Sequence, residues 1–331
     1  MCYHLRYHSF SVSFVGDCGA GDLARADTYP VKSPGLIVNR LIQGGERFQA
    51  ITLTAPGSVT LRHAGIRPTF FIPPPTRKRG HFVCSDPALN EIWELGAYSL
   101  LLNQVPVRSL PPLVSTASTG TWIFRRPAAQ DVNAFAILFG VAPADQWNSI
   151  LQKLKAALYT ANGPLTFDPK SGFTVIISPF SSSFETWARF ESSDATGALS
   201  LIRTEWGHMR KGQPFYSGGT WERMTPDAVP DSIATSLAHG WGSGPTSALS
   251  KYVLGVRPVS PGYKTWLVEP QPGDLTWAKG RVPTPHGPIE VRWEKEGNEF
   301  VLLLEVPDGT LGTVGVPVSG SPDTLFVNGQ R

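Results

Sequence analysis

Two segments of the chain place ionisable side chains among glycines and a tryptophan. The first, residues 218–227, contains Glu222 between a tryptophan and Arg223, and the second, residues 236–247, contains His239. Both are predicted to be loops that precede helices, and loops held by a rigid scaffold often carry catalytic groups. An apolar neighbour and a cation tune the ionisation of a carboxylate, so Glu222 has the surroundings of a catalytic carboxylate. The alternative is a simple surface ion pair between Glu222 and Arg223.

The elements that must position these loops follow the order strands, helices, strands. Strand patterns fall at residues 35–63 and return from residue 261 onward, whereas six segments between residues 85 and 255 have apolar residues at helical spacing. Three helices are predicted to be capped by aspartates: Asp86, Asp131 and Asp194. Side chains expected to face inward include Leu89, Ile92, Trp93, Leu100, Phe135, Leu138, Trp147, Ile150, Leu151, Leu154, Leu158, Leu199, Ile202, Trp206 and Met209. Such segregated runs favour separate layers or domains over alternating βαβ units.

The amino-acid sequences of the two loops resemble those of a known family of enzymes. The loops read Gly-Gly-Thr-Trp-Glu-Arg-Met from residue 218 and Ser-Leu-Ala-His-Gly-Trp-Gly-Ser-Gly-Pro-Thr from residue 236. This pair resembles the α-L-rhamnosidases of glycoside hydrolase family 78, especially their fungal and actinobacterial members. The resemblance extends over most of residues 22–316, through further segments that begin at Leu41, Phe82, Asp131, Tyr252 and Gly262.

The resemblance implies a multidomain α and β chain with an incomplete (α/α)6 toroid between β-domains. Residues 1–80 would be an N-terminal β-sandwich fragment and linker. Residues 81–258 would be a partial (α/α)6 catalytic-type helical domain, and residues 259–331 a C-terminal antiparallel β-sandwich. Twelve helices of about 11–12 residues with loops of about 5 need roughly 200 residues, whereas residues 82–258 carry only six helical patterns. We therefore expect an open arc of helices with exposed apolar faces.

The activity that the resemblance implies is inverting hydrolysis of terminal non-reducing α-L-rhamnose from rhamnosides. Matched motif by motif, Glu222 is the general base and His239 lines the sugar subsite. His239 alternatively caps a helix or is satisfied by the backbone. Trp221 and Trp241 would present their faces to the sugar ring, with core packing as the alternative for either. A rhamnose-containing glycoside is thus the implied ligand, and no cofactor is expected.

An inverting glycosidase also needs a carboxylic acid that protonates the leaving oxygen, and the family segment that carries it is not found here. From residue 113 the sequence has no carboxylate until Asp131. Three replacements remain open: Glu185 on an apolar helix, Asp168 in a proline-flanked loop, and Asp131. Asp131 is predicted to cap a helix, and that position lowers rather than raises the pKa of a carboxyl group. The competing hypothesis is a catalytically impaired or incomplete relative that at most binds sugar, including a product that lacks an exon.

Composition excludes several other classes of function. The 331 residues carry a formal net charge of +3, without the cationic excess that nucleic-acid binding requires. No run approaches 18 apolar residues, so no membrane span is expected. The three cysteines, Cys2, Cys18 and Cys84, do not predict a disulfide framework. Cys2, His4 and His8 lack a fourth ligand at useful spacing, and a frayed terminus without an export signal is expected there.

Overall fold

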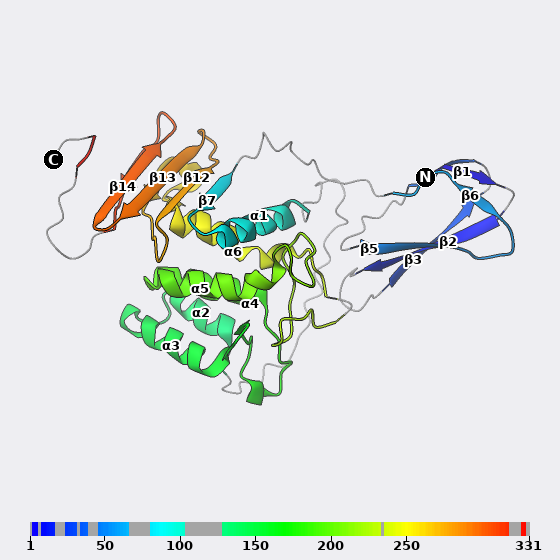
Figure 1. Ribbon diagram of the computed structural model, residues 1–331, viewed down its shortest axis with the longest axis horizontal. Coiled ribbons are helices and arrows are strands. Elements are labelled where there is room, and N and C mark those ends of the chain that lie inside the picture. The colour runs from blue at the N-terminus through cyan, green and yellow to red at the C-terminus, as the bar shows by residue number, and fades with distance from the viewer. Residues whose placement is uncertain are drawn as a thin grey trace.

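The protein is described by a computed structural model. It describes residues 2–5, 8–16, 24–31, 34–38, 46–65, 80–102, 128–232, 235–317 and 326–328. The described residues form two small N-terminal sheets, a stack of helices, and two C-terminal sheets (Figure 1). A two-stranded sheet, β8 (Tyr159–Thr160) and β9 (Gly163–Pro164), lies among the helices in the sequence. Cys18 and most of the segment in which the acidic motif was sought, residues 103–127, lie outside the described residues.

Six strands near the N-terminus form two three-stranded antiparallel sheets. One sheet has the order β4-β1-β6, from β4 (Gly35–Leu36), β1 (Cys2–Leu5) and β6 (Val59–Leu61). The other has the order β3-β2-β5, from β3 (Ala24–Val31), β2 (His8–Gly16) and β5 (Glu46–Leu53). The expected fraying of the terminus is wrong, because Cys2 and His4 lie in β1 and His8 begins β2. The non-local pairing that orders these residues has no local signal.

Helices make up the centre of the molecule. The bounds are α1 (Pro87–Leu102), α2 (Gln130–Leu138), α3 (Trp147–Leu158), α4 (Pro179–Glu191), α5 (Ala195–Trp206) and α6 (Gly244–Ala248). A π-helical turn, Leu249–Val253, extends α6. In Figure 1, α1 and α6 lie under the C-terminal sheet, α4 and α5 form the next layer, and α2 and α3 lie beyond them. The six helical patterns in the sequence are thereby confirmed as helices.

Two of the three predicted caps are present. The Asp86 carboxylate accepts a hydrogen bond from the Ala88 amide at 2.7 Å, and the Asp194 carboxylate accepts one from the Gly197 amide at 3.0 Å. Asp131 is not a cap, because α2 begins one residue earlier and Ala129 occupies the cap position. A backbone bridge between Ala129 and Phe167 fixes this start, so a tertiary contact determines it.

Most of the side chains expected to face inward are buried, with five exceptions. Trp147 and Ile150 of α3 are only partly buried. Leu100 of α1 is 46% exposed. In α2 the buried face is formed by Ala134 and Ile137, and Phe135 and Leu138 are only partly buried. The small Ala134 packs in a cluster with buried residues of α3 and α4, which rotates the bulky residues of α2 toward the rim of the contact.

The C-terminal strands form a four-stranded and a three-stranded sheet. The larger sheet is antiparallel with the order β14-β13-β12-β7; its strands are β14 (Glu299–Glu305), β13 (Ile289–Glu296), β12 (Trp277–Val282) and β7 (His81–Cys84). The smaller sheet has the order β10-β11-β15, from β10 (Val256–Pro258), β11 (Thr265–Val268) and β15 (Leu311–Val314). The expectation of purely antiparallel strands is wrong for one pair, because β11 and β15 run parallel.

The helices and the C-terminal sheet share one hydrophobic core. Trp293 of β13 is fully buried, and its indole N–H donates to the carbonyl of Val253 at 2.8 Å. β7 pairs with β12 although it precedes all the helices in the sequence. The division of the chain into three domains remains a prediction. Residues 81–84 were assigned to the helical domain, yet they pair with β12, a strand that follows the predicted boundary at residue 259. The candidate-site residue Trp221 belongs to this same core.

Candidate active site

The two loop segments that carry Glu222 and His239 are hydrogen-bonded to each other along their backbones. The Glu222 amide donates to the Ser236 carbonyl at 2.9 Å, and the His239 amide donates to the Thr220 carbonyl at 2.7 Å. The Thr220 hydroxyl donates in return to the His239 carbonyl at 2.8 Å. This pairing brings the two ionisable residues side by side although they are distant in the sequence.

The Glu222 carboxylate is held at both of its oxygens. Oε1 accepts a hydrogen bond from Nη1 of Arg223 at 3.2 Å, and Oε2 accepts one from the Ser236 amide at 3.2 Å. Nδ1 of His239 lies 4.0 Å from Oε2, which is too long for a hydrogen bond. Each oxygen of an ionised carboxylate has two lone-pair sites, so both retain a position that can accept a proton from water.

Arg223 contacts a second carboxylate in addition to Glu222. Its Nε donates to Oδ2 of Asp231 at 2.8 Å. Asp231 also accepts a hydrogen bond from the Thr235 hydroxyl. Sequence reasoning missed Asp231, which lies between the two segments that the motifs marked. The local signal of its contact with Arg223 is weak: two hydroxyl residues, Ser232 and Thr235, follow it in the sequence.

The two tryptophans of the site lie in different surroundings. Trp241 is 51% exposed, and its ring lies against His239 with the ring centroids 4.2 Å apart and against Phe180 at 5.1 Å. Trp221 is only 1% exposed, and its amide donates to the Met209 sulfur at 3.4 Å. Trp241 can therefore present a face to a ligand, whereas the burial of Trp221 favours the core-packing alternative.

Two glycines allow the second loop to approach the rest of the site closely. A Cβ atom on Gly242 would lie 2.6 Å from the carbonyl oxygen of Trp221, and one on Gly244 would lie 2.0 Å from Oγ of Ser183 on α4. No side chain fits at such distances, so these positions require glycine. The Gly242 carbonyl also accepts a hydrogen bond from the buried Trp206 indole at 2.7 Å, which ties the loop to α5.

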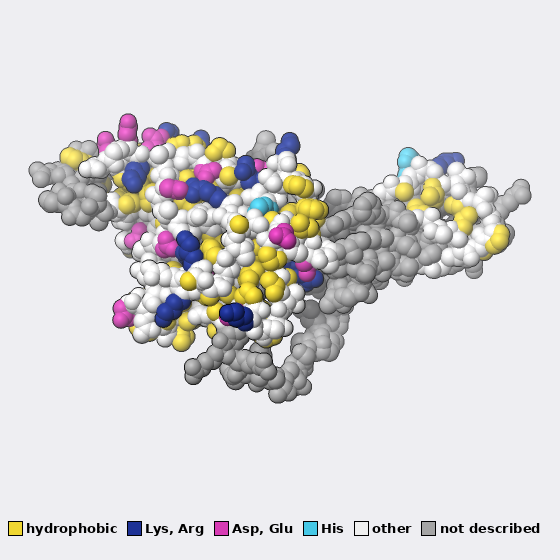
Figure 2. Space-filling view, turned by 60° about the horizontal axis from the view of Figure 1, so that its bottom comes forward, with side chains coloured by type: hydrophobic (Ala, Val, Ile, Leu, Met, Phe, Trp, Pro, Cys, Tyr) yellow, Lys and Arg dark blue, Asp and Glu magenta, His cyan; other side chains and the backbone are white. Residues whose placement is uncertain are grey.

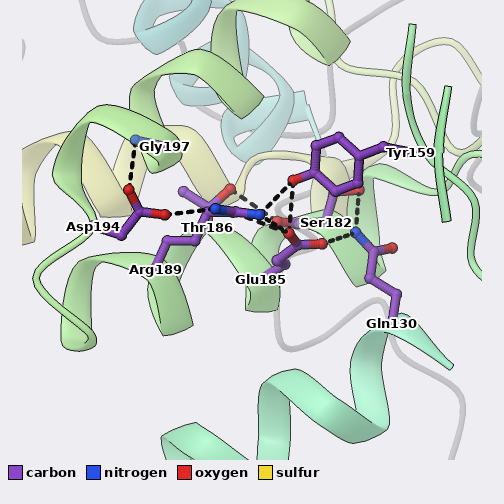
Figure 3. A network of polar contacts seen from close by, with 8 residues as sticks. All are labelled: Gln130, Tyr159, Ser182, Glu185, Thr186, Arg189, Asp194 and Gly197. Carbon is purple, nitrogen blue, oxygen red and sulfur yellow. Dashed lines mark hydrogen bonds and ion pairs between the residues drawn. The ribbon is translucent and has the colours of Figure 1, made fainter. Parts of the chain in front are cut away.

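Glu185, the first of the open replacements for the general acid, is fully buried in a network of polar contacts (Figure 3). Its Oε1 accepts from the Tyr159 hydroxyl at 2.7 Å and from Arg189 at 2.8 and 3.0 Å, and its Oε2 accepts from Gln130 at 2.8 Å. Arg189 also binds Asp194 at 2.5 Å. Figure 3 shows these side chains converging from α2, α4 and the segment that follows α3. This buried carboxylate, which accepts hydrogen bonds at both oxygens, joins these elements and is not accessible as a proton donor.

The other two replacements are engaged with neighbouring backbone. Asp168 accepts from the Lys170 amide at 2.8 Å and caps a short 3₁₀ turn. Asp131 accepts from the amide of Val132 at 2.8 Å. Neither has a contact with Glu222 or His239 among those that the described residues make, so neither is brought together with the candidate base.

A buried acid that the sequence analysis did not single out lies on α5. The Glu205 side chain is fully buried, and neither of its oxygens has a hydrogen-bond partner in the described part of the chain. Burial, reinforced by the negative charge of Glu185, raises the pKa of the Glu205 carboxyl well above its usual range; nearby Ser182 acts in the opposite direction and does not offset burial. The signal was a charged residue in an apolar helical stripe, between Ile202 and Met209.

The described part of the chain contains neither a candidate metal site nor a helix that could span a membrane. Among the residues that the structure describes, no three His, Cys, Asp or Glu side chains are grouped so that they could hold a metal ion. No helix within the described ranges is long and apolar enough to cross a bilayer. The side chains that the site brings together are a held carboxylate, an imidazole and an exposed indole face.

Known proteins resemble this chain in sequence and in fold. Residues 255–325 match the family described as the bacterial α-L-rhamnosidase C-terminal domain. An α-L-rhamnosidase of Streptomyces avermitilis is 26% identical over 121 residues, which cover 34% of this chain and 12% of that protein. An α-L-rhamnosidase of Formosa agariphila is 30% identical over 115 residues, again 34% of this chain and 12% of the relative. The chain is α-L-rhamnosidase-like.

The fold agrees with this resemblance. The crystal structure of a rhamnosidase of glycoside hydrolase family 78 from Bacillus sp. GL1 superposes on 96% of this chain with a TM-score of 0.59 and 15% sequence identity. The chain covers 51% of that structure, and the aligned stretches span about an eighth of the two sequence relatives. The resemblance to α-L-rhamnosidases that the sequence analysis stated is confirmed. The roles of Glu222, His239, Trp221 and Trp241 remain predictions.

Proposed function

We propose that this α-L-rhamnosidase-like chain carries a site for inverting hydrolysis of terminal non-reducing α-L-rhamnose from rhamnosides. The observation that carries the proposal is the juxtaposition of Glu222 and His239, with the Glu222 carboxylate held by Arg223 and the Ser236 amide. In this assignment Glu222 takes a proton from the attacking water. His239 hydrogen-bonds a sugar hydroxyl, and the exposed face of Trp241 packs against the sugar ring.

The architecture that we infer supplies the context for this site. We assign α1–α6 to part of an (α/α)6 toroid and the C-terminal strands to a β-sandwich. Support comes from the superposition on the Bacillus structure and from apolar side chains at the surface of the helical body, such as Phe139 at 74% exposure and Val132 at 63%. Figure 2 shows hydrophobic side chains gathered on one face of this body, as expected for helices that form an open arc.

A second candidate function, a catalytically impaired relative that at most binds sugar, is favoured by the surroundings of the available acids. Glu185 is locked by Arg189 and Tyr159. Asp231, the carboxylate that shares Arg223 with Glu222, already accepts hydrogen bonds from Arg223 and from the Thr235 hydroxyl. General acid catalysis supplies about 10²–10⁴-fold in rate, so we expect little turnover of natural rhamnosides.

The comparison of two substrates separates these functions. An aryl α-L-rhamnoside with an acidic phenol as leaving group depends little on protonation, whereas a natural rhamnoside depends on it strongly. We expect slow hydrolysis of the activated substrate and little or none of the natural one. Brisk hydrolysis of a natural rhamnoside would contradict the inference that this chain lacks a general acid. Glu185 and Asp168 would then be the residues to test for that role. Binding of L-rhamnose without hydrolysis of either substrate would support the sugar-binding relative.

A further inference from the structure

We propose that Asp231 is a positioning residue that holds the Arg223 guanidinium against Glu222. The inference deepens the proposed function, on which it rests, because it identifies what orients the carboxylate assigned as the base. Arg223 joins the two carboxylates directly: its Nε donates to Oδ2 of Asp231 at 2.8 Å and its Nη1 donates to Oε1 of Glu222 at 3.2 Å.

The shape of the guanidinium makes this link directional. Its donors lie in one plane at fixed angles, so the bond from Nε to Asp231 determines where Nη1 points. The side chains of Glu222 and Asp231 are 15% and 18% exposed, and that of Arg223 is 35% exposed. Fully exposed pairs contribute little because water screens them and the side chains are mobile. This partly buried arrangement restricts both effects.

Glu222 and Arg223 lie in an irregular segment that is neither strand nor helix, so secondary structure alone does not fix the direction of the Arg223 side chain. The bond to Asp231 supplies an anchor for it. Asp231 is itself held by the Thr235 hydroxyl, and the Ser232 amide donates to that hydroxyl oxygen at 3.2 Å.

The consequence of this chain of contacts is a carboxylate fixed at two points. Arg223 holds Oε1 of Glu222 and the Ser236 amide holds Oε2. Without Asp231 the guanidinium loses this anchor, and Oε1 of Glu222 is held less firmly. Misplacement of a reacting group by about 1 Å can lower a rate by about 10²-fold. In the described part of the chain Asp231 contacts Arg223 and Thr235 and not His239 or Trp241, the residues assigned to the sugar, so its loss should lower kcat and leave KM nearly unchanged.

The first test compares Asp231→Asn with Asp227→Asn, using the full chain and an activated aryl α-L-rhamnoside. Asp227 is an exposed carboxylate of the same loop, so the control makes the same change of charge. We expect Asp231→Asn to lower kcat by about tenfold or more with KM within about twofold, and Asp227→Asn to have no effect. Arg223→Lys should resemble Asp231→Asn, because an ammonium group lacks the planar fork. Equal rates for the two asparagine variants would overturn the inference.

A second test does not depend on turnover. A double-mutant cycle of Glu222→Gln and Asp231→Asn is measured by denaturant unfolding, once with Arg223 and once with Arg223→Gln. We expect the two changes to be coupled by at least about twofold in the unfolding equilibrium constant with Arg223 present, and additive without it. Additivity in both backgrounds would overturn the inference. Absence of any turnover by the unmodified chain would instead count against the proposed function, while this cycle still decides the role of Asp231.

Discussion

Glu185 and Glu205 are both fully buried on adjacent helices, yet only the Glu185 carboxylate is matched by donors. Tyr159, Arg189 and Gln130 donate to Glu185, whereas neither oxygen of Glu205 has a partner in the described part of the chain. Burial, reinforced by the charge on Glu185, raises the pKa of the Glu205 carboxyl. The fold therefore supplies donors to one of the two buried acids and disfavours the charged form of the other.

Replacement of the buried acid by its neutral isostere should change how stability depends on pH. The folded-state pKa of Glu205 lies above the unfolded value, so its favourable contribution is complete below the unfolded pKa of about 4.3. That contribution is lost as pH rises toward the folded-state pKa, at about 1.4 kcal/mol per pH unit. We expect Glu205→Gln to gain stability relative to the unmodified chain as pH increases. The measurement is the free energy of unfolding of both proteins across pH 4–8; a difference independent of pH would contradict the assignment.

Removal of the cation from the buried network should be costly. Arg189→Met leaves the Glu185 carboxylate in the interior without its ion pair, and such changes cost about 3–5 kcal/mol. The double variant with Glu185→Met as well should be less destabilised than the single one, because no unpaired charge remains buried. Denaturant unfolding of the two variants measures this. A double variant less stable than Arg189→Met would contradict this prediction, because Glu185 would then stabilise the fold even without its cation.

Truncation of the two tryptophans of the site should affect different properties: the stability of the fold for Trp221, and the binding of L-rhamnose for Trp241. Trp221→Ala removes a fully buried ring and should cost about 3–5 kcal/mol of stability. Trp241→Ala removes a half-exposed ring and should change stability by about 0.5 kcal/mol or less, while L-rhamnose binding becomes weaker. Thermal unfolding and titration with L-rhamnose distinguish the cases. Unchanged rhamnose binding by Trp241→Ala would remove that residue from the proposed sugar site.

A methyl group at Gly242 should disturb the site more than one at Gly207. The added Cβ at Gly242 would lie 2.6 Å from a backbone oxygen, whereas Gly207 has nothing within 4 Å of the same position. We expect Gly242→Ala to cost about 1–3 kcal/mol, the usual cost of overpacking, and Gly207→Ala to be nearly neutral. Equal unfolding midpoints for the two variants would mean that the glycine-rich loop tolerates more movement than its contacts indicate.

Local sequence signals predicted those features of the fold that local interactions determine. Asp86 and Asp194 cap their helices because an aspartate and the amides beyond it are close in sequence. Asp131 failed as a cap because a bridge from Ala129 to Phe167 starts α2 earlier. The pairing of β7 with β12 across the whole helical region had no sequence signal, because strand patterns do not specify distant partners.

The candidate site likewise contains residues that the sequence predicted and residues that it did not. The motifs marked Glu222 and His239, and backbone pairing between their loops brings them together. Asp231 was missed because its role depends on how an irregular loop folds back onto Arg223. Glu205 was missed because one acid in an apolar stripe resembles a helix edge until the neighbouring helices are in place.

The assignment of Glu222 as general base is tested most directly by the rate at which Glu222→Gln hydrolyses an activated aryl α-L-rhamnoside. The amide keeps the shape of the side chain but cannot take a proton from water. We predict that whatever hydrolysis the unmodified chain shows is lost in this variant, with the folded structure retained in circular dichroism. Hydrolysis at an undiminished rate by correctly folded Glu222→Gln would contradict the account.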